Sequence, residues 1–241
     1  MNKDGNDVPL SLNSLFYRSD DSDCDSIDKN FNNLYSSRSI TLGDKDFIVR
    51  EYSWDENNAN RIWPCTYLLA DYIKKNEILY QNRSWIEFGS GTGVLALFIS
   101  SLNWSISGNT TDFDDGIDDN IAKNIKHNFD TNNISSICHL RHSWGNEFIP
   151  TMMNVLNMNS NNQIEIIFAS DILIYAKQYQ NLVQSLSHLF DKYGTKTFLM
   201  AWNRPKFTNV EDFFTLMKDA SFIVNKPSKN IYSFTKEIVV V

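Results

Sequence analysis

Residues 85–95 read WIEFGSGTGVL, an apolar run that ends in an acid and leads into three glycines at alternate positions, Gly89, Gly91 and Gly93. The run before the glycines has the length and composition of a buried strand, and the apolar stretch after them is typical of a helix. A strand, a glycine turn and a helix in this order form the first unit of a doubly wound α/β fold. Glycine is needed where φ is positive or where a ligand lies against the backbone, so this turn is also a candidate ligand site.

Strand and helix patterns alternate along the rest of the chain. They predict strands at 84–88, 104–112, 136–142, 164–170, 195–202, 222–226 and 231–241, and helices at 64–76, 92–102, 117–129, 178–193 and 210–220. The stretch 39–52 predicts a β-hairpin that turns at Gly43-Asp44, and the polar stretch 154–163 predicts a loop. This order predicts a doubly wound, mostly parallel seven-stranded sheet with helices on both faces, in which ligands bind beyond the carboxyl ends of the strands.

The first 36 residues differ in composition from the rest of the chain. Residues 1–36 are rich in Asp, Ser and Asn and predict a disordered acidic tail, whereas residues 37–241 have enough apolar residues for one domain. Asn is frequent throughout, which we interpret as a compositional habit that says little about function.

The net charge, the hydropathy and the cysteine spacing indicate which binding partners to expect. The formal net charge is -7, with 22 Lys and Arg against 29 Asp and Glu, which disfavours a nucleic-acid partner. No apolar run approaches the roughly 18 residues that span a bilayer, so we expect no membrane partner. The 3 cysteines show no metal-ligand spacing, so we expect free thiols and no bound metal. We expect a monomer in the cytoplasm, with the nucleus as a second compartment.

An acid lies where folds of this kind bind ribose. Asp112 ends the expected second strand, nineteen residues after Gly93, and an acid about twenty residues beyond such a turn binds ribose hydroxyls. The G-x-G-x-G spacing differs from the G-x-G-x-x-G of dinucleotide-binding turns. Together the two features favour an adenosine cofactor, although a glycine turn alone can be only a tight connection between a strand and a helix.

The motifs support a closer resemblance. Glu87 followed by G-x-G-x-G resembles motif I of the class I S-adenosylmethionine-dependent methyltransferases. ANRIWPCTYLLADYI (59–73), LRHSWG (140–145) and FASDILIY (168–175) resemble the Trp-Pro, Trp-Gly and Asp-Tyr signatures of methyltransferase family 16, a lysine-methyltransferase-like group. The resemblance covers residues 38–241. It implies a Rossmann-like fold, S-adenosyl-L-methionine as the cofactor and methyl transfer to a protein lysine.

The turn, the second strand and the resemblance together give the candidate site. The expected cofactor-binding residues are Trp63, Glu87, Gly89, Ser90, Gly91, Gly93, Asp112, Phe113, Trp144 and Ser170. The expected catalytic residues are Asp171 and Tyr175, and Trp202 and Asn203 are expected on the acceptor side. A lone Trp is more often a core residue, which we expect for Trp54 and Trp85.

The chain departs from the family pattern after the fourth strand. The family mostly shows Asp-x-x-Tyr, whereas one additional residue separates Asp171 from Tyr175 here. Either the turn is longer, or Tyr175 faces elsewhere and packs beneath the following helix. A carboxylate at the strand end, such as that of Asp171, can still orient an amine acceptor.

Three other functions stay open at this point. A small-molecule N-methyltransferase would share every motif. A binding module derived from a methyltransferase would keep the cofactor site without a productive acceptor channel. A dinucleotide-dependent enzyme would share the glycine turn and the second-strand acid, but it gains nothing from the Trp signatures.

Overall fold

The computed structural model describes residues 35–52, 61–102, 104, 108–112, 117–129, 134, 137–155, 163–204 and 209–236, without the side chains of 117–119 and 155. The predicted tail therefore lies outside the described residues, apart from Tyr35 and Ser36, which belong to the first strand. Trp54, one of the two expected core tryptophans, also lies outside them.

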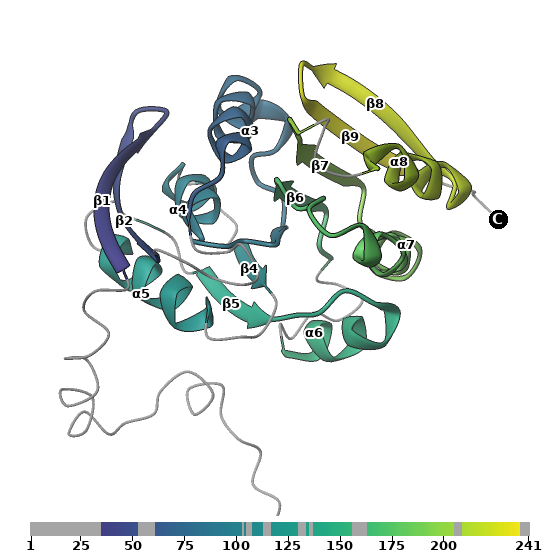
Figure 1. The fold of residues 1–241 in the computed structure, drawn as a ribbon, viewed down its shortest axis with the longest axis horizontal. Coiled ribbons are helices and arrows are strands. Elements are labelled where there is room, and N and C mark those ends of the chain that lie inside the picture. Colours follow the sequence, from purple (N-terminus) through teal and green to yellow (C-terminus); the bar gives the residue numbers. More distant parts are fainter. Residues whose placement is uncertain are drawn as a thin grey trace, which may run out of the picture. The chain divides into compact units, whose positions relative to one another are not determined.

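Seven strands form the main sheet (Figure 1). They are β3 (Trp85–Phe88), β4 (Gly108–Asp112), β5 (Ile137–Arg141), β6 (Ile166–Ser170), β7 (Thr197–Ala201), β8 (Phe222–Ser228) and β9 (Ile231–Lys236), in the spatial order β5-β4-β3-β6-β7-β9-β8. The first five are parallel, and β9 pairs antiparallel with both β7 and β8. The strand order reverses between β3 and β6, so the ligand crevice is expected at their carboxyl ends. The predicted fold is confirmed.

Helices cover both faces of this sheet (Figure 1). The α-helices are α3 (Pro64–Lys75), α4 (Val94–Ser101), α5 (Ile117–Phe129), α6 (Ile149–Val155), α7 (Tyr179–Tyr193) and α8 (Val210–Asp219). The short 3-10 helices are η1 (Glu77–Leu79), η2 (Asn146–Phe148) and η3 (Ala176–Gln178). Alternate strand residues enter two separate cores, one with α3 and α4 and the other with α6, α7 and α8. Among the described residues, no helix is both long and apolar enough to cross a membrane.

The predicted hairpin forms a separate two-stranded sheet of β1 (Tyr35–Leu42) and β2 (Lys45–Tyr52). Gly43 turns it with a φ of 59°, and a Cβ at Gly43 would lie 3.1 Å from the Phe98 ring on α4. Phe47 and Val49 of β2 are fully buried, so the hairpin packs its apolar side on the domain.

Helix α6 is the one α-helix of the described chain that the sequence patterns did not predict. It has only seven residues, and its buried face consists of Ile149, Met152 and Met153. A helix of two turns gives too little periodicity to be recognised. Its last two residues lie in the stretch predicted as a loop, and residues 156–162 of that stretch lie outside the described residues.

Trp85 is a core residue, as expected, and it restricts its neighbour on β4. It is 1% exposed, and Gly108 is its partner in the parallel register. A Cβ built on Gly108 would lie 1.9 Å from Cζ2 of the indole. Gly108 therefore leaves the space that the Trp85 ring occupies.

Gly108→Ala should therefore destabilise the fold by overpacking, at a cost of about 1–3 kcal/mol in the free energy of unfolding. The same change in a Trp85→Leu background should cost clearly less, because the smaller side chain vacates the space. Urea unfolding of the four proteins in this double-mutant cycle measures the coupling. Equal costs in both backgrounds would show that the Trp85 ring is not the obstacle.

Candidate cofactor and acceptor site

The turn after β3 has a backbone that only glycine adopts easily. Gly89, Gly91 and Gly93 have φ values of 65°, 56° and 75°, which are strained for residues with a side chain. The N–H of Gly93 donates to the carbonyl of Ser90 at 2.8 Å, and Gly93 is the N-cap of α4. A Cβ on Gly89 would lie 2.7 Å from Cγ2 of Ile172, which follows β6. The turn therefore packs closely against the residues that follow β6, at the point where the strand order reverses.

The end of β4 is bonded to this turn. Ser90 donates its N–H to the carbonyl of Thr111 at 3.0 Å, and the Thr111 hydroxyl donates to the carbonyl of Glu87 at 2.9 Å. The carboxylate of Asp112 accepts the N–H of Gly91. Asp112 therefore lies beside the glycine turn, as its spacing predicted. Phe113, the next residue, lies outside the described residues.

Glu87 is buried beneath the turn. It is 1% exposed, and burial raises the pKa of its carboxyl to about 8. Its Oε2 has no hydrogen-bond partner among the described residues. A buried acid with an unmatched oxygen at a ligand crevice is a candidate polar contact for a ligand.

Trp144 reaches the same turn from the segment after β5. Its Cζ2 lies 3.9 Å from the position of a Cβ on Gly89. The N–H of Gly145 donates to Oγ of Ser185 on α7 at 2.7 Å, which fixes the backbone next to the indole. His142, two residues earlier, is 5% exposed, and burial lowers its pKa to about 4, so it is a neutral residue at pH 7.

Asp171 connects the ends of β6 and β7 with the start of α3. Its φ is 54°, and its N–H donates to the carbonyl of Ala201 at 3.1 Å. Oδ2 accepts the N–H of Cys65 at 2.8 Å, and Oδ1 lies 3.1 Å from Nε of Arg204. The Arg204 guanidinium in turn lies 3.9 Å from the centroid of the Trp63 ring. The structure therefore joins two predicted residues, Asp171 and Trp63, through an arginine that the sequence analysis did not select.

Ser170 takes part in the same contact between β6 and α3. Its hydroxyl lies 3.0 Å from that of Thr66, and both residues are buried. The Trp-Pro signature in the sequence indicates that the start of α3 faces Asp171. Pro64 is the first residue of α3, so the N–H of Cys65 has no partner within the helix and donates to the Asp171 carboxylate.

Tyr175 is 40% exposed and ends the segment before η3. The buried tyrosine of this region is Tyr179, the first residue of α7, which is 2% exposed and donates its hydroxyl to the carbonyl of Leu173 at 3.0 Å. The catalytic roles of Asp171 and Tyr175 stay predictions.

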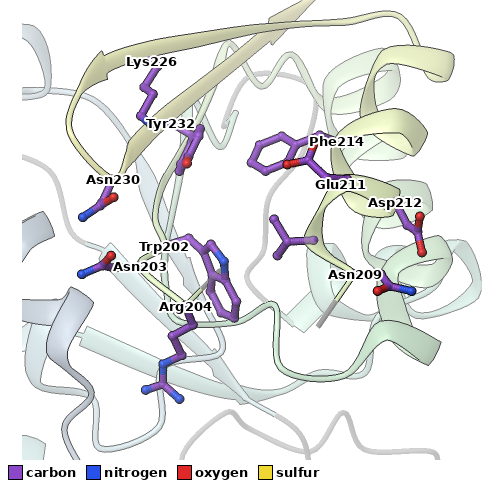
Figure 2. Close-up of a pocket in the computed structure, with 11 residues that line it drawn as sticks. Trp202, Asn203, Arg204, Asn209, Glu211, Asp212, Phe214, Lys226, Asn230 and Tyr232 are labelled. Atoms are coloured by element: carbon purple, nitrogen blue, oxygen red, sulfur yellow. The ribbon is translucent and has the colours of Figure 1, made fainter. Parts of the chain in front are cut away.

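Trp202 and Asn203, expected on the acceptor side, line a pocket of about 570 Å³ at the carboxyl end of β7 (Figure 2). Arg204, the start of α8 and the β8–β9 hairpin complete the lining. Trp202 is 3% exposed and donates its backbone N–H to the carbonyl of Asn230 at 2.9 Å. Its indole Nε1 has no hydrogen-bond partner within the described ranges. Phe214 and Tyr232, which sequence reasoning missed, add aromatic surface to the pocket.

The turn suits a cationic ligand tail better than a pyrophosphate. The carboxylate of Asp112 lies at the turn, where it repels phosphate oxygens and attracts an amino group. Burial raises the pKa of Glu87 to about 8, so Glu87 offers a hydrogen bond at pH 7 and not a negative charge. Carboxylate oxygens are also suitable acceptors for ribose hydroxyls. Trp144 offers an aromatic surface nearby for adenine or for a sulfonium charge.

A comparison with protein families decides the assignment. Residues 42–220 match the family described as lysine methyltransferase. The chain belongs to this family. Lysine methyltransferases of this family use S-adenosyl-L-methionine as the cofactor, and the acids and glycines of the turn fit it.

Two lysine methyltransferases are similar in sequence to most of this chain. EEF1A lysine methyltransferase 3 from Xenopus tropicalis is 26% identical over 196 residues, which cover 78% of this chain and 80% of the relative. Protein N-lysine methyltransferase METTL21A from Xenopus tropicalis is 21% identical over 157 residues, which cover 65% of this chain and 66% of the relative.

Solved methyltransferase structures share the fold. The 16S rRNA methyltransferase RsmC from T. thermophilus superposes with a TM-score of 0.54 at 14% identity, over 85% of this chain and 51% of that one. A protein from Pyrococcus horikoshii described as an RNA methyltransferase has a TM-score of 0.52 at 13% identity, over 80% of this chain and 93% of its own. At these identities the likeness concerns the fold alone.

Asp112→Asn should weaken S-adenosylmethionine and S-adenosylhomocysteine by the same factor, about tenfold or more. An Asn has one acceptor oxygen, and the Gly91 N–H and the ribose hydroxyls would compete for it, whereas charge-assisted hydrogen bonds are worth about 1.5–3 kcal/mol. Calorimetric titration of both ligands measures the two losses. A loss confined to the sulfonium ligand would place Asp112 beside the methyl group and contradict a ribose contact.

Glu87→Gln should change how stability depends on pH. Burial raises the pKa from 4.5 in the unfolded chain to about 8 in the folded protein. The contribution of Glu87 to the free energy of unfolding is therefore fully present below pH 4.5 and is lost as the pH rises through 8. The stability of the wild type relative to Glu87→Gln should fall between about pH 5 and 9 in denaturant unfolding without cofactor. A constant difference over this range would show that Glu87 is ionised when folded.

Proposed function

We propose that this methyltransferase acts on a lysine side chain of a protein substrate, and that the lysine enters through the pocket at the carboxyl end of β7. The position of that pocket supports the proposal most strongly, because Arg204 both lines it and pairs with Asp171 at the next strand end. Both relatives are named as lysine methyltransferases, which agrees with this acceptor.

When bound, S-adenosylmethionine supplies an electrophilic methyl group on a sulfonium sulfur. The chain aligns the reactants and excludes water, since the leaving group is neutral and needs no acid. The glycine turn and Asp112 would hold the ribose and the amino-acid tail, and Trp144 would cover one side. These residues would orient the bound cofactor relative to the acceptor pocket.

The acceptor amine must lose a proton before it attacks, because a free lysine has a pKa of about 10.4. The aromatic side chains of Trp202, Phe214 and Tyr232 remove water from a bound amine, and desolvation lowers its pKa. An unpaired carboxylate nearby would have the opposite effect. Arg204 pairs with Asp171 at 3.1 Å and so offsets the charge that would otherwise favour the ammonium form.

We also propose that the protein is a monomer of the cytoplasm, with the nucleus as a second compartment, and that it binds neither nucleic acid nor membranes. The acidic net charge of -7 supports the exclusion of nucleic acid.

Transfer of a labelled methyl group to a cell extract tests the acceptor class. The full chain is incubated with methyl-labelled cofactor and extract, and the labelled species are identified by mass spectrometry. Label on lysine in a protein is the expected result. Label only in small molecules would identify a small-molecule N-methyltransferase, and binding of cofactor without any transfer would identify a non-catalytic module.

The acids at the start of α8 provide a matched pair of variants for the pocket. Figure 2 shows the Glu211 carboxylate pointing toward the pocket interior beside Phe214, whereas that of Asp212 points away. Glu211→Gln should lower kcat/KM for the methylated protein about twofold to fivefold, mainly through a higher KM, because an exposed carboxylate weakly attracts the incoming ammonium. Asp212→Asn should leave it unchanged, and neither variant should alter the Kd of the cofactor. Equal losses in both variants would show a general charge effect instead of a contact inside the pocket.

A further inference from the structure

The open edge of β2 is paired by asparagine side chains of α5. Asn128 accepts the N–H of Ile48 at 2.9 Å and donates Nδ2 to the carbonyl of the same residue at 2.8 Å. Asn124 does the same with Arg50, at 2.8 and 3.2 Å. Asn120 also donates to the Arg50 carbonyl, at 3.1 Å. The amides therefore take the place of a neighbouring strand.

The spacing of the two elements explains this match. Four helical residues rise about 6 Å, and two strand residues span about 6.6 Å. Asn124 and Asn128 are four apart on the helix, and their partners Arg50 and Ile48 are two apart on the strand. Both asparagines are 1% exposed, so these hydrogen bonds are sheltered from water.

One of these asparagines also contacts the cofactor turn. Nδ2 of Asn124 donates to the carbonyl of Thr92 at 2.9 Å. Thr92 lies between Gly91 and Gly93 and is 2% exposed. A single amide thus holds the backbone of the hairpin and the backbone of the glycine turn.

Glu51, the residue after Arg50 on β2, contacts the segment that carries Trp63. Glu51 accepts the N–H of Ile62 at 2.7 Å, and Ile62 directly precedes Trp63. Arg38 of β1 holds the same carboxylate with two contacts, at 2.6 and 3.2 Å. The hairpin is therefore bonded to the backbone beside Trp63 as well as to the glycine turn.

We propose that the β1–β2 hairpin is a clamp that positions two walls of the cofactor site, with Asn124 and Glu51 as its positioning residues. Asn124 holds the glycine turn, and Glu51 holds the segment that carries Trp63. The proposal rests on the placement of S-adenosylmethionine at the turn. If the hairpin served only to bury apolar surface such as that of Phe47 and Val49, these two polar contacts would matter for stability but not for cofactor affinity.

A matched pair of variants on α5 separates these two roles. In Asn124→Asp and Asn128→Asp the side chain still accepts the β2 N–H, loses its donor and places a carboxylate beside a carbonyl. Both variants should lose thermal stability. Only Asn124→Asp should raise the Kd of S-adenosylmethionine and S-adenosylhomocysteine by about tenfold, while Asn128→Asp should change it less than about twofold. An added negative charge would favour the cationic ligand, so charge does not account for a common loss.

A second pair of variants tests the contact that Glu51 makes with the segment before Trp63. Its result does not depend on whether the α5 variants fold. Glu51→Ala removes the acceptor of the Ile62 N–H, whereas Arg38→Ala removes the ion pair and keeps that acceptor. Cofactor affinity should fall in Glu51→Ala and stay near the wild-type value in Arg38→Ala. All titrations are made well below the lowest melting temperature of the set.

Equal Kd changes within both pairs, or wild-type affinity in Asn124→Asp and Glu51→Ala, would overturn the clamp. A wild-type protein that binds no S-adenosylmethionine would instead overturn the cofactor assignment on which the clamp rests. The two failures are therefore distinguishable in one set of titrations.

Discussion

The structure depends most on the left-handed backbone of the turn after β3. Positive φ at three glycines lets the chain leave the strand and enter α4 within five residues. That path places the Gly91 N–H against Asp112 and the Thr92 carbonyl against Asn124. Asp112 and the hairpin are both attached to this turn, so a change in its path would move several parts of the candidate site together.

The pairing of Asp171 with Arg204 resolves a conflict in the chemistry. An acid near an amine acceptor orients it but also keeps it protonated, which opposes attack. In this structure one carboxylate oxygen binds the Cys65 N–H and the other faces a guanidinium. Asp171 then holds the start of α3 and, through Arg204, the Trp63 ring. Under the proposed function, the carboxylate does so without presenting an uncompensated charge to the acceptor amine.

The sequence predicted the sheet well because its strands are short apolar runs between clear turn residues, and because the glycine spacing identifies the first crossover. The position of Asp112 followed from spacing alone. Arg204 was missed because its partner lies on another strand, and a pairing of residues 33 apart leaves no local pattern. Helix α6 was missed because two turns show no reliable period.

The asparagines show where a compositional interpretation fails. Frequent Asn suggested a habit of the chain, yet Asn120, Asn124 and Asn128 recur every four residues and bond to strand residues that are 70 to 80 positions away. Asp lacks the donor that a carbonyl needs, and Gln has a longer and more mobile side chain to order. Asn is thus the shorter of the two amide side chains, and like a peptide group it offers a separate acceptor oxygen and donor nitrogen to a strand edge. A run of Asn with helical period on the buried face of an amphipathic helix therefore indicates a strand edge that needs a partner, even though the sequence does not say which strand it is.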